Sequence, residues 1–179
     1  MPIIHAIILG IVQGLTEFLP ISSSGHLVMV PQLLGWKELD PSIEKTFDVA
    51  LHSGTLIGAI AYLQKDVRRI IVSIFKWLRT REMDKYANLG LLLLVTCIPG
   101  AILGALFEDF ISENLGKPAF VATNLIVFGI ILWFADKLKG HRKDTNFEIK
   151  DAVVAGASQA FALAPGVSRS GITMTALRA

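Results

Sequence analysis

Three ionisable residues lie inside apolar stretches of this chain: Glu17, His26 and Arg169. A charged side chain at the centre of a spanning helix costs about 2.5–3.5 kcal/mol, so such residues are functional candidates by default. The Arg169 guanidinium suits a phosphate or a carboxylate. Glu17 could hold a divalent cation or act as a general base, and His26 could act as acid, base or nucleophile. The alternative is a structural ion pair between Glu17 and Arg169.

Hydroxyl groups accompany these charges in two polar stretches, residues 13–26 and 159–171. The candidate ligand-binding hydroxyls are Ser22, Ser23, Ser24, Ser168, Ser170 and Thr173. A serine can also simply cap a helix. If a helix restarts after each serine-rich turn, its N-terminus favours an anion, and the set then resembles a phosphate cradle. A serine beside a base could also be the nucleophile, so the residues alone leave serine and histidine open.

The second stretch is a weaker copy of the first, displaced by 146 positions. The matching pairs are Gln13 with Gln159, Ser22 with Ser168, Ser24 with Ser170 and Gly25 with Gly171. The charges are divided between the copies, with Glu17 and His26 in one and Arg169 in the other. This pattern predicts one site built from both stretches.

The composition indicates that membrane helices position this site. The 179 residues are 53% hydrophobic and only 18% charged, with a mean hydropathy of +0.57. A soluble domain carries about 25% charged residues. The net charge of +2 is too small to indicate nucleic acid binding, and the single Cys97 excludes a disulfide framework.

The apolar runs predict three spans and two broken hairpins. The spans are residues 47–64, 86–107 (with a kink at Pro99) and 118–135. Short apolar segments at 2–15 and 27–34 flank Pro20 and a turn over Ser22–Gly25, while the segment at 151–164 ends at Pro165 and Gly166. Glycines four residues apart, at Gly10 and Gly14, Gly54 and Gly58, and Gly100 and Gly104, favour close helix packing.

Charge bias predicts how the spans are oriented. The basic segments 65–85 and 137–150 should be cytoplasmic, and 35–46 and 108–117 external. The two hairpins then enter from opposite sides. We therefore expect an all-α, polytopic membrane protein with inverted repeats, each containing a re-entrant helical hairpin. The single membrane domain, 1–179, divides into a first repeat with its spans, 1–136, and the incomplete start of a second, 137–179.

Two further patterns can be explained by packing or by a surface position alone. Ile70, Ile71, Ile74, Trp77 and Leu78 share one helical face, which could meet a membrane surface or pack on neighbouring helices. His5, His52 and His141 lack convergent polar partners in the sequence, so we interpret them as packing or surface residues.

The motifs closely resemble those of the undecaprenyl-diphosphatase (bacitracin-resistance membrane phosphatase) family. Gln13 and Glu17 match a Glu/Gln-x-x-x-Glu motif, and residues 20–26 match Pro-x-Ser-Ser-Ser-Gly-His. Residues 165–173 match Pro-Gly-x-Ser-Arg-Ser-x-x-Thr at every fixed position, and Phe47–His52 also looks like the family. The resemblance covers essentially the whole chain.

The resemblance implies a multi-pass protein of the bacterial inner membrane that removes the terminal phosphate of undecaprenyl diphosphate and recycles the cell-wall carrier lipid. It implies a divalent cation, Mg²⁺ or alternatively Ca²⁺, with Glu17 as its ligand. The catalytic positions would be Glu17, Ser23, His26 and Arg169, and the substrate-binding positions Gln13, Ser22, Ser24, Ser168, Ser170 and Thr173. Gln13 replaces the glutamate that is frequent at its position.

The sequence is also compatible with one other function and with an inactive protein. An inverted repeat also supports alternating access, so a transporter or flippase of a polyprenyl phosphate is one alternative. Family members continue past the second motif, whereas this chain stops at Ala179, so an inactive truncated remnant is the other. The oligomeric state is open between a monomer and a homodimer.

Overall fold

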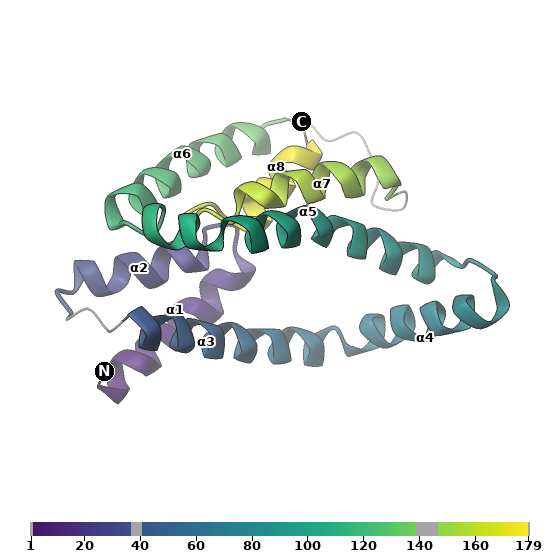
Figure 1. The fold of residues 1–179 in the computed structure, drawn as a ribbon, viewed down its shortest axis with the longest axis horizontal. Coiled ribbons are helices and arrows are strands. Elements are labelled where there is room, and N and C mark those ends of the chain that lie inside the picture. Colours follow the sequence, from purple (N-terminus) through teal and green to yellow (C-terminus); the bar gives the residue numbers. More distant parts are fainter. Residues whose placement is uncertain (1, 37–40, 139–146, 179) are drawn as a thin grey trace.

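The computed structural model describes residues 2–36, 41–138 and 147–178, and these residues form helices without strands (Figure 1). The helices are α1 (Ile3–Phe18), α2 (Ser23–Leu33), α3 (Pro41–Tyr62), α4 (Gln64–Thr80), α5 (Lys85–Asn114), α6 (Pro118–Asp136), α7 (Ile149–Phe161) and α8 (Arg169–Arg178). The predicted all-α class is confirmed. Parts of the polar segments 35–46 and 137–150, including His141, lie outside the described residues.

Two helices among the described residues are long and apolar enough to cross a membrane, Lys85–Phe107 within α5 and Pro118–Asp136. Only 17% and 11% of their most apolar windows are buried inside the protein, so most apolar side chains point outward, as on lipid-facing helices. Pro118 lies in the first turn of α6, as expected.

The predicted first span, 47–64, needs correction. α3 ends at Tyr62, and α4 starts at Gln64 after a bend of 82°. α3 is long and apolar enough to cross a membrane only when it is taken together with α4. If this bent pair is one span, the described residues contain three spans. The bend coincides with Gln64, Lys65 and Asp66, polar residues that are costly in an apolar layer.

α5 also differs from expectation. Its backbone leaves helical dihedral angles at Phe107 (φ −121°, ψ 17°) and not at Pro99, and the helix continues to Asn114 where we predicted a loop at 108–117. Near Pro99, α7 packs directly against α5, because a Cβ on Gly156 would lie 3.0 Å from the Thr96 oxygen and 3.3 Å from Pro99 Cδ. This contact supports the helix at the point where proline removes a backbone hydrogen bond.

Both polar stretches form a helix, a break and a second helix. α1 and α2 are separated by residues 19–22, and α7 and α8 by residues 162–168. The first break is shorter than predicted, because Ser22 is the N-cap of α2, so the residues from Ser23 onward are helical. The entry of these hairpins from opposite sides of a membrane, and the repeat boundaries, remain predictions.

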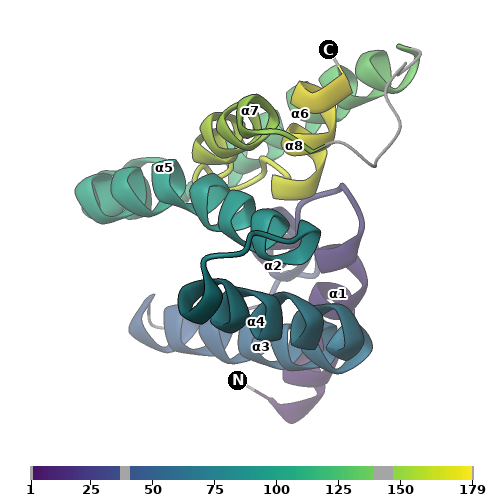
Figure 2. The same cartoon turned by 90° about the vertical axis from the view of Figure 1, so that its right-hand side faces the viewer.

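Each break packs against the start of the helix that follows the other break. A Cβ on Gly25 would lie 3.2 Å from Gly166 Cα, and one on Gly171 would lie 3.3 Å from the Pro20 oxygen. Gly166 has φ +92° and room for no Cβ, since Val121 O would be 2.5 Å away. Figure 2 shows α7 and α8 on one side and α1 and α3 on the other, with α2 and α5 between them.

The glycine pairs do not mark the tight helix contacts. A Cβ on Gly14, Gly54, Gly58 or Gly100 would meet nothing within 4 Å, so the prediction from four-residue spacing is wrong there. Besides the glycines of the hairpins described above, the tight contacts are at Gly156 and at Gly90, where a Cβ would lie 2.6 Å from Ile70 Cγ2. Spacing alone does not say which helix face has a neighbour.

We predict that Gly156→Leu destabilises the protein while Gly58→Leu does not. Both replacements gain helix propensity, but only the first forces α7 away from α5, and overpacking costs about 1–3 kcal/mol. Thermal unfolding in detergent, followed by circular dichroism, should show a lower midpoint for Gly156→Leu alone. Equal midpoints for the two variants would contradict the described α5–α7 contact.

Candidate active site

The two breaks enclose a polar cavity of about 240 Å³. Seven of the predicted site residues line it: Glu17, Ser22, Ser23, Ser24, Ser168, Arg169 and Ser170. The cavity therefore draws on both copies of the repeated stretch, as the sequence predicted. Helices α2 and α8 both begin at this cavity, so the free backbone N–H groups of their first turns favour an anion there.

Glu17 is held by hydrogen bonds from its own hairpin. Its Oε2 atom accepts a short hydrogen bond of 2.5 Å from the Ser23 hydroxyl and one of 3.1 Å from Gln13 Nε2. Gln13 is 1% exposed and also donates to Thr55 Oγ1 at 3.1 Å. Gln13 thus lies behind the cavity wall and fixes the Glu17 carboxylate, while Ser23 carries the hydroxyl closest to a base.

The other serines play matching structural roles in the two copies. Ser22 Oγ accepts from Gly25 N at 3.3 Å, and Ser168 Oγ accepts from Gly171 N at 3.1 Å. Each capping hydroxyl also pairs with the serine two residues on, Ser24 at 3.3 Å and Ser170 at 3.2 Å. The capping interpretation therefore holds for Ser22 and Ser168, which leaves Ser23 as the serine with a distinct chemical setting.

Arg169 is the positive group of the cavity. It is exposed, and among the described residues its guanidinium forms neither an ion pair nor a hydrogen bond. The alternative of a structural ion pair with Glu17 is therefore wrong for this structure. A planar guanidinium with five available donors is well suited to an anion that enters the cavity.

Besides Gln13, two predicted residues do not line the polar cavity. His26 lines a neighbouring cavity of about 440 Å³, which shares the Ser168 wall. The His26 Nδ1–H group donates to the Ser22 carbonyl at 2.8 Å, because a carbonyl oxygen can only accept. Thr173 lines neither cavity, and its hydroxyl bonds to the carbonyls of Arg169 and Ser170.

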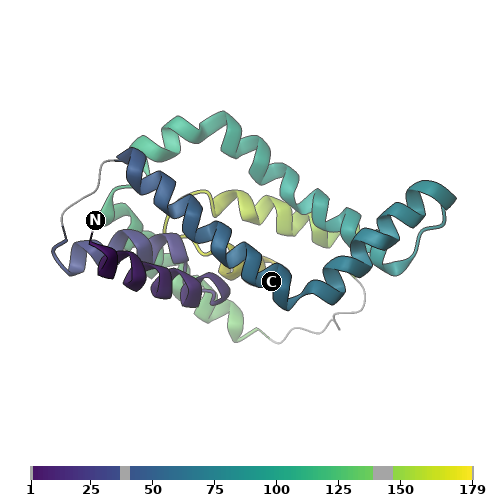
Figure 3. The same cartoon turned by 90° about the horizontal axis from the view of Figure 1, so that it is seen from below.

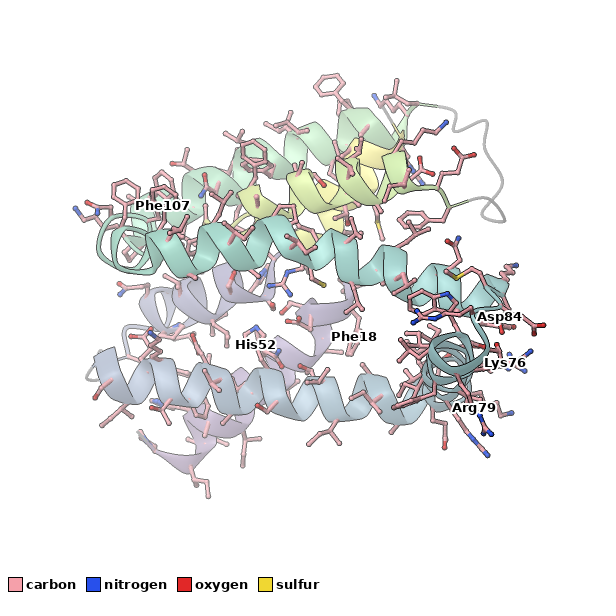
Figure 4. The ribbon with its side chains drawn as sticks, turned by 45° about the vertical axis from the view of Figure 1, so that its right-hand side comes forward. Phe18, His52, Lys76, Arg79, Asp84 and Phe107 are labelled. Carbon is pink, nitrogen blue, oxygen red and sulfur yellow. The ribbon has the colours of Figure 1, made fainter. Side chains whose placement is uncertain are left out.

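His52 is a site residue that the sequence analysis missed. It projects from α3 toward the part of the bundle that holds α1 and α2 (Figure 4), and its Nε2 atom lies 3.5 Å from Glu17 Oε2. Its Nδ1–H group donates to the Asp48 carbonyl at 2.8 Å. Because Nδ1 carries that proton, the contact with Glu17 is favourable only with a proton or a cation between the two atoms. The interpretation of His52 as a packing or surface residue missed this contact with Glu17, whereas His5 does pack, stacked on Trp36.

His52 also connects the polar cavity to a larger cleft. It lines both the 240 Å³ cavity and a cleft of about 1120 Å³ beside α3 and α5. The sequence held one hint of this role, the spacing of His52 from Thr55, because residues three apart share one helix face. In the structure Thr55 on that face contacts Gln13. Nothing in the sequence said which helix that face would meet.

The side chains of the polar cavity fit a divalent cation whose coordination is completed by oxygen atoms of a bound substrate. No group of three or more His, Cys, Asp or Glu side chains forms a metal cluster within the described part of the chain. Glu17 is the carboxylate that lines the polar cavity. Mg²⁺ is usually bound through one or two carboxylates together with substrate phosphates and waters, so Glu17 fits that mode.

Comparison with known proteins identifies similar chains. The family model described as "Bacitracin resistance protein BacA" matches residues 6–179. An "Undecaprenyl-diphosphatase" of Teredinibacter turnerae is 41% identical over 177 residues, covering 98% of this chain and 66% of the relative. A protein of the same name from Gemmatimonas aurantiaca is 44% identical over 180 residues, covering 99% of this chain and 66% of the relative.

A third relative of that name, from Moorella thermoacetica, is 44% identical over 177 residues, covering 98% of this chain and 65% of its own length. The present chain thus spans about two thirds of the length of these relatives. The similarity runs through both polar stretches and the helices between them.

Proposed function

Because this chain belongs to the BacA family of bacitracin resistance proteins, we propose that it hydrolyses undecaprenyl diphosphate to undecaprenyl phosphate and phosphate. The names of its relatives support this substrate. The outward-facing apolar helices support a site that a lipid reaches from within a membrane, which we take to be the bacterial inner membrane. Release of undecaprenyl phosphate would return the carrier lipid to cell-wall synthesis.

The pair of Ser23 and Glu17 is the observation that carries this proposal. A serine hydroxyl 2.5 Å from a carboxylate, in a cavity that also holds an unpaired guanidinium, combines a nucleophile, a base and an anion-binding group. A site that only bound or transported the lipid would need the anion-binding group but not the nucleophile and base. We therefore favour Ser23 over His26 as the nucleophile.

In the proposed reaction, Ser23 Oγ attacks the terminal phosphorus and Glu17 takes its proton. The bond from that phosphorus to the bridging oxygen breaks, and undecaprenyl phosphate leaves with the bonding electrons. Glu17 then passes the proton to solvent and accepts one from a water that attacks the phosphoserine. The bond between phosphorus and Ser23 Oγ then breaks and Glu17 returns the proton to Oγ, which releases inorganic phosphate and restores the Ser23 hydroxyl.

The remaining residues would bind and orient the diphosphate. Arg169 and the N-termini of α2 and α8 stabilise the negative charge that spreads over the phosphoryl oxygens. Gln13 holds Glu17 in place, and His52 contacts it from α3. A bound divalent cation, Mg²⁺ or Ca²⁺, held by Glu17 and the substrate oxygens would supply further charge neutralisation.

A transporter or flippase of a polyprenyl phosphate is the second candidate, and the repeated helix–break–helix arrangement favours it. The two functions differ in one product, since only the phosphatase releases inorganic phosphate.

We predict that the purified protein with Mg²⁺ releases phosphate from undecaprenyl diphosphate and that Arg169→Ala lowers this rate by about 10²–10³-fold. Arg178→Ala is the matched control on α8, because Arg178 pairs with Asp136 away from the cavity. The assay should include a chain extended to the length of the relatives. Movement of intact lipid across a vesicle without phosphate release would support the transporter instead.

We predict that Ser23→Ala lowers phosphate release by about 10³-fold or more, since loss of a nucleophile removes a whole step of the reaction. The control is Ser24→Ala, which changes a hydroxyl of the same cavity that pairs with Ser22 and not with Glu17. Mass spectrometry of acid-quenched enzyme should find phosphate on Ser23. Phosphorylation of His26 in a still active Ser23→Ala variant would make His26 the nucleophile.

We predict that His52→Leu lowers phosphate release by about 10-fold or more, because a polar contact to a charged group contributes about 1.5–3 kcal/mol. His52→Gln should retain most of the activity, since its amide can still face Glu17 and the phosphate. Steady-state kinetics of both variants, beside their thermal unfolding midpoints, separate this role from packing. Equal losses in the two variants would argue against it.

A further inference from the structure

The exposed side of α4 is an apolar surface that no other part of the described chain covers. α4 divides its apolar residues between two sides. Ile70, Ile74 and Trp77 are half-buried, and the first two contact α5 at Gly90. The second set, which we call the outer face, consists of Ile71, Phe75 and Leu78, with exposed fractions of 48%, 68% and 51%. Packing on a neighbouring helix is therefore confirmed for one side, while contact of the other side with a membrane surface stays a prediction.

The location of α4 fits a membrane interface. α4 is bent by 82° from α3, so it runs across the end of that helix rather than along it (Figure 3). It contacts α5 at Gly90, near the start of the apolar segment Lys85–Phe107. A helix that packs near the first turns of a span lies near the level at which that span leaves the apolar layer.

Basic residues form a strip beside the outer face, made of Lys65, Arg68, Lys76 and Arg79. At 3.6 residues per turn, these four positions fall within an arc of roughly 80° that adjoins the side of Phe75. Among the described residues, Lys65, Arg68 and Arg79 form no ion pair, while Lys76 contacts Glu82 at 3.7 Å on the surface. Three of the four basic side chains of the strip thus carry positive charge that no acidic group in the described chain neutralises.

The nearby acidic groups are already engaged. Asp66 pairs with Arg69 at 3.3 Å, and the Arg69 guanidinium also lies over the Tyr86 ring. Asp84 caps α5 by accepting from Ala87 N at 2.8 Å, and this hydrogen bond lowers the pKa of its carboxyl. These contacts leave the basic strip as the dominant charge on this side of α4.

We propose that α4 is an interfacial anchor that inserts its outer face among lipid acyl chains and binds anionic phospholipid headgroups with its basic strip. An amphipathic helix with basic residues beside an exposed apolar face has the composition of such anchors. The positive-inside rule assigns this end of the spans to the cytoplasmic side of the membrane, where anionic lipids complement the basic strip. Each basic side chain near such a surface strengthens the attraction about fivefold.

The experiment uses fluorescence quenching in vesicles and needs no enzymatic activity. Phe75→Trp is made in a chain whose own tryptophans, Trp36, Trp77 and Trp133, are replaced by phenylalanine. The protein is reconstituted in phosphatidylcholine vesicles that contain a minor fraction of phosphatidylglycerol. The bromine quencher is placed on the acyl chains of either lipid, so the ratio of the two quenching efficiencies reports which lipid surrounds residue 75.

Brominated phosphatidylglycerol should quench Phe75→Trp several times more strongly per molecule than brominated phosphatidylcholine, and added salt should reduce this preference. Adding Arg68→Gln and Arg79→Gln should bring the ratio close to one. The matched control, Arg69→Gln, removes a charge that is already paired with Asp66 and should leave the ratio nearly unchanged. A tryptophan at Val72, on the side of the basic strip, should be quenched less.

Circular dichroism of each variant establishes that α4 and the rest of the protein remain helical. Absence of quenching at position 75 would mean that protein covers the outer face, and it would overturn the proposal. Equal quenching by the two lipids, unaffected by Arg68→Gln and Arg79→Gln, would also overturn it, because the strip would then bind no headgroup.

Discussion

The packing of each helix break against the start of the helix in the other hairpin is the contact on which the rest of the structure depends. A break exposes backbone N–H and C=O groups, which an apolar surrounding cannot satisfy. Here the protein satisfies them locally: Ser22 and Ser168 cap the restarting helices, and Asn124 Nδ2 donates to the Pro165 carbonyl at 2.9 Å. Gly25 and Gly166 then allow the start of α2 to touch the second break, so a polar cavity can exist inside a very apolar chain.

The cavity combines a fixed acidic side with an open basic side. Glu17 is restrained by Ser23 from α2, Gln13 from α1 and His52 from α3, so three helices determine where its carboxylate lies. Arg169 has no such restraint, since nothing in the described chain neutralises it. An anion that binds there would be recognised by Arg169 and the helix N-termini while Glu17 stays in place, which is the kind of preorganisation that favours catalysis over binding alone.

The outer helices serve a different purpose from the hairpins. α5 and α6 keep most of their surface outward, and α4 shares its apolar residues between α5 and the outside. Their tight contacts include glycines that face a neighbour, Gly90 and Gly156 for α5 and Gly25 and Gly166 for α6. Such a frame can surround a polar centre and still present an apolar exterior to lipid, which is consistent with a site reached from the membrane.

Local sequence determined the elements and much of the site: Pro20 and the Pro165–Gly166 pair end helices by their own backbone chemistry, and the repeated serines cap the helices that follow. The motifs also identified Glu17, Ser23 and Arg169 before any contact was known. Only the tertiary structure decided that His52 reaches Glu17, that His26 faces another cavity, and that Arg169 has no partner among the described residues. These facts depend on which faces of distant helices meet, and the pattern along one helix carries no information about its neighbour.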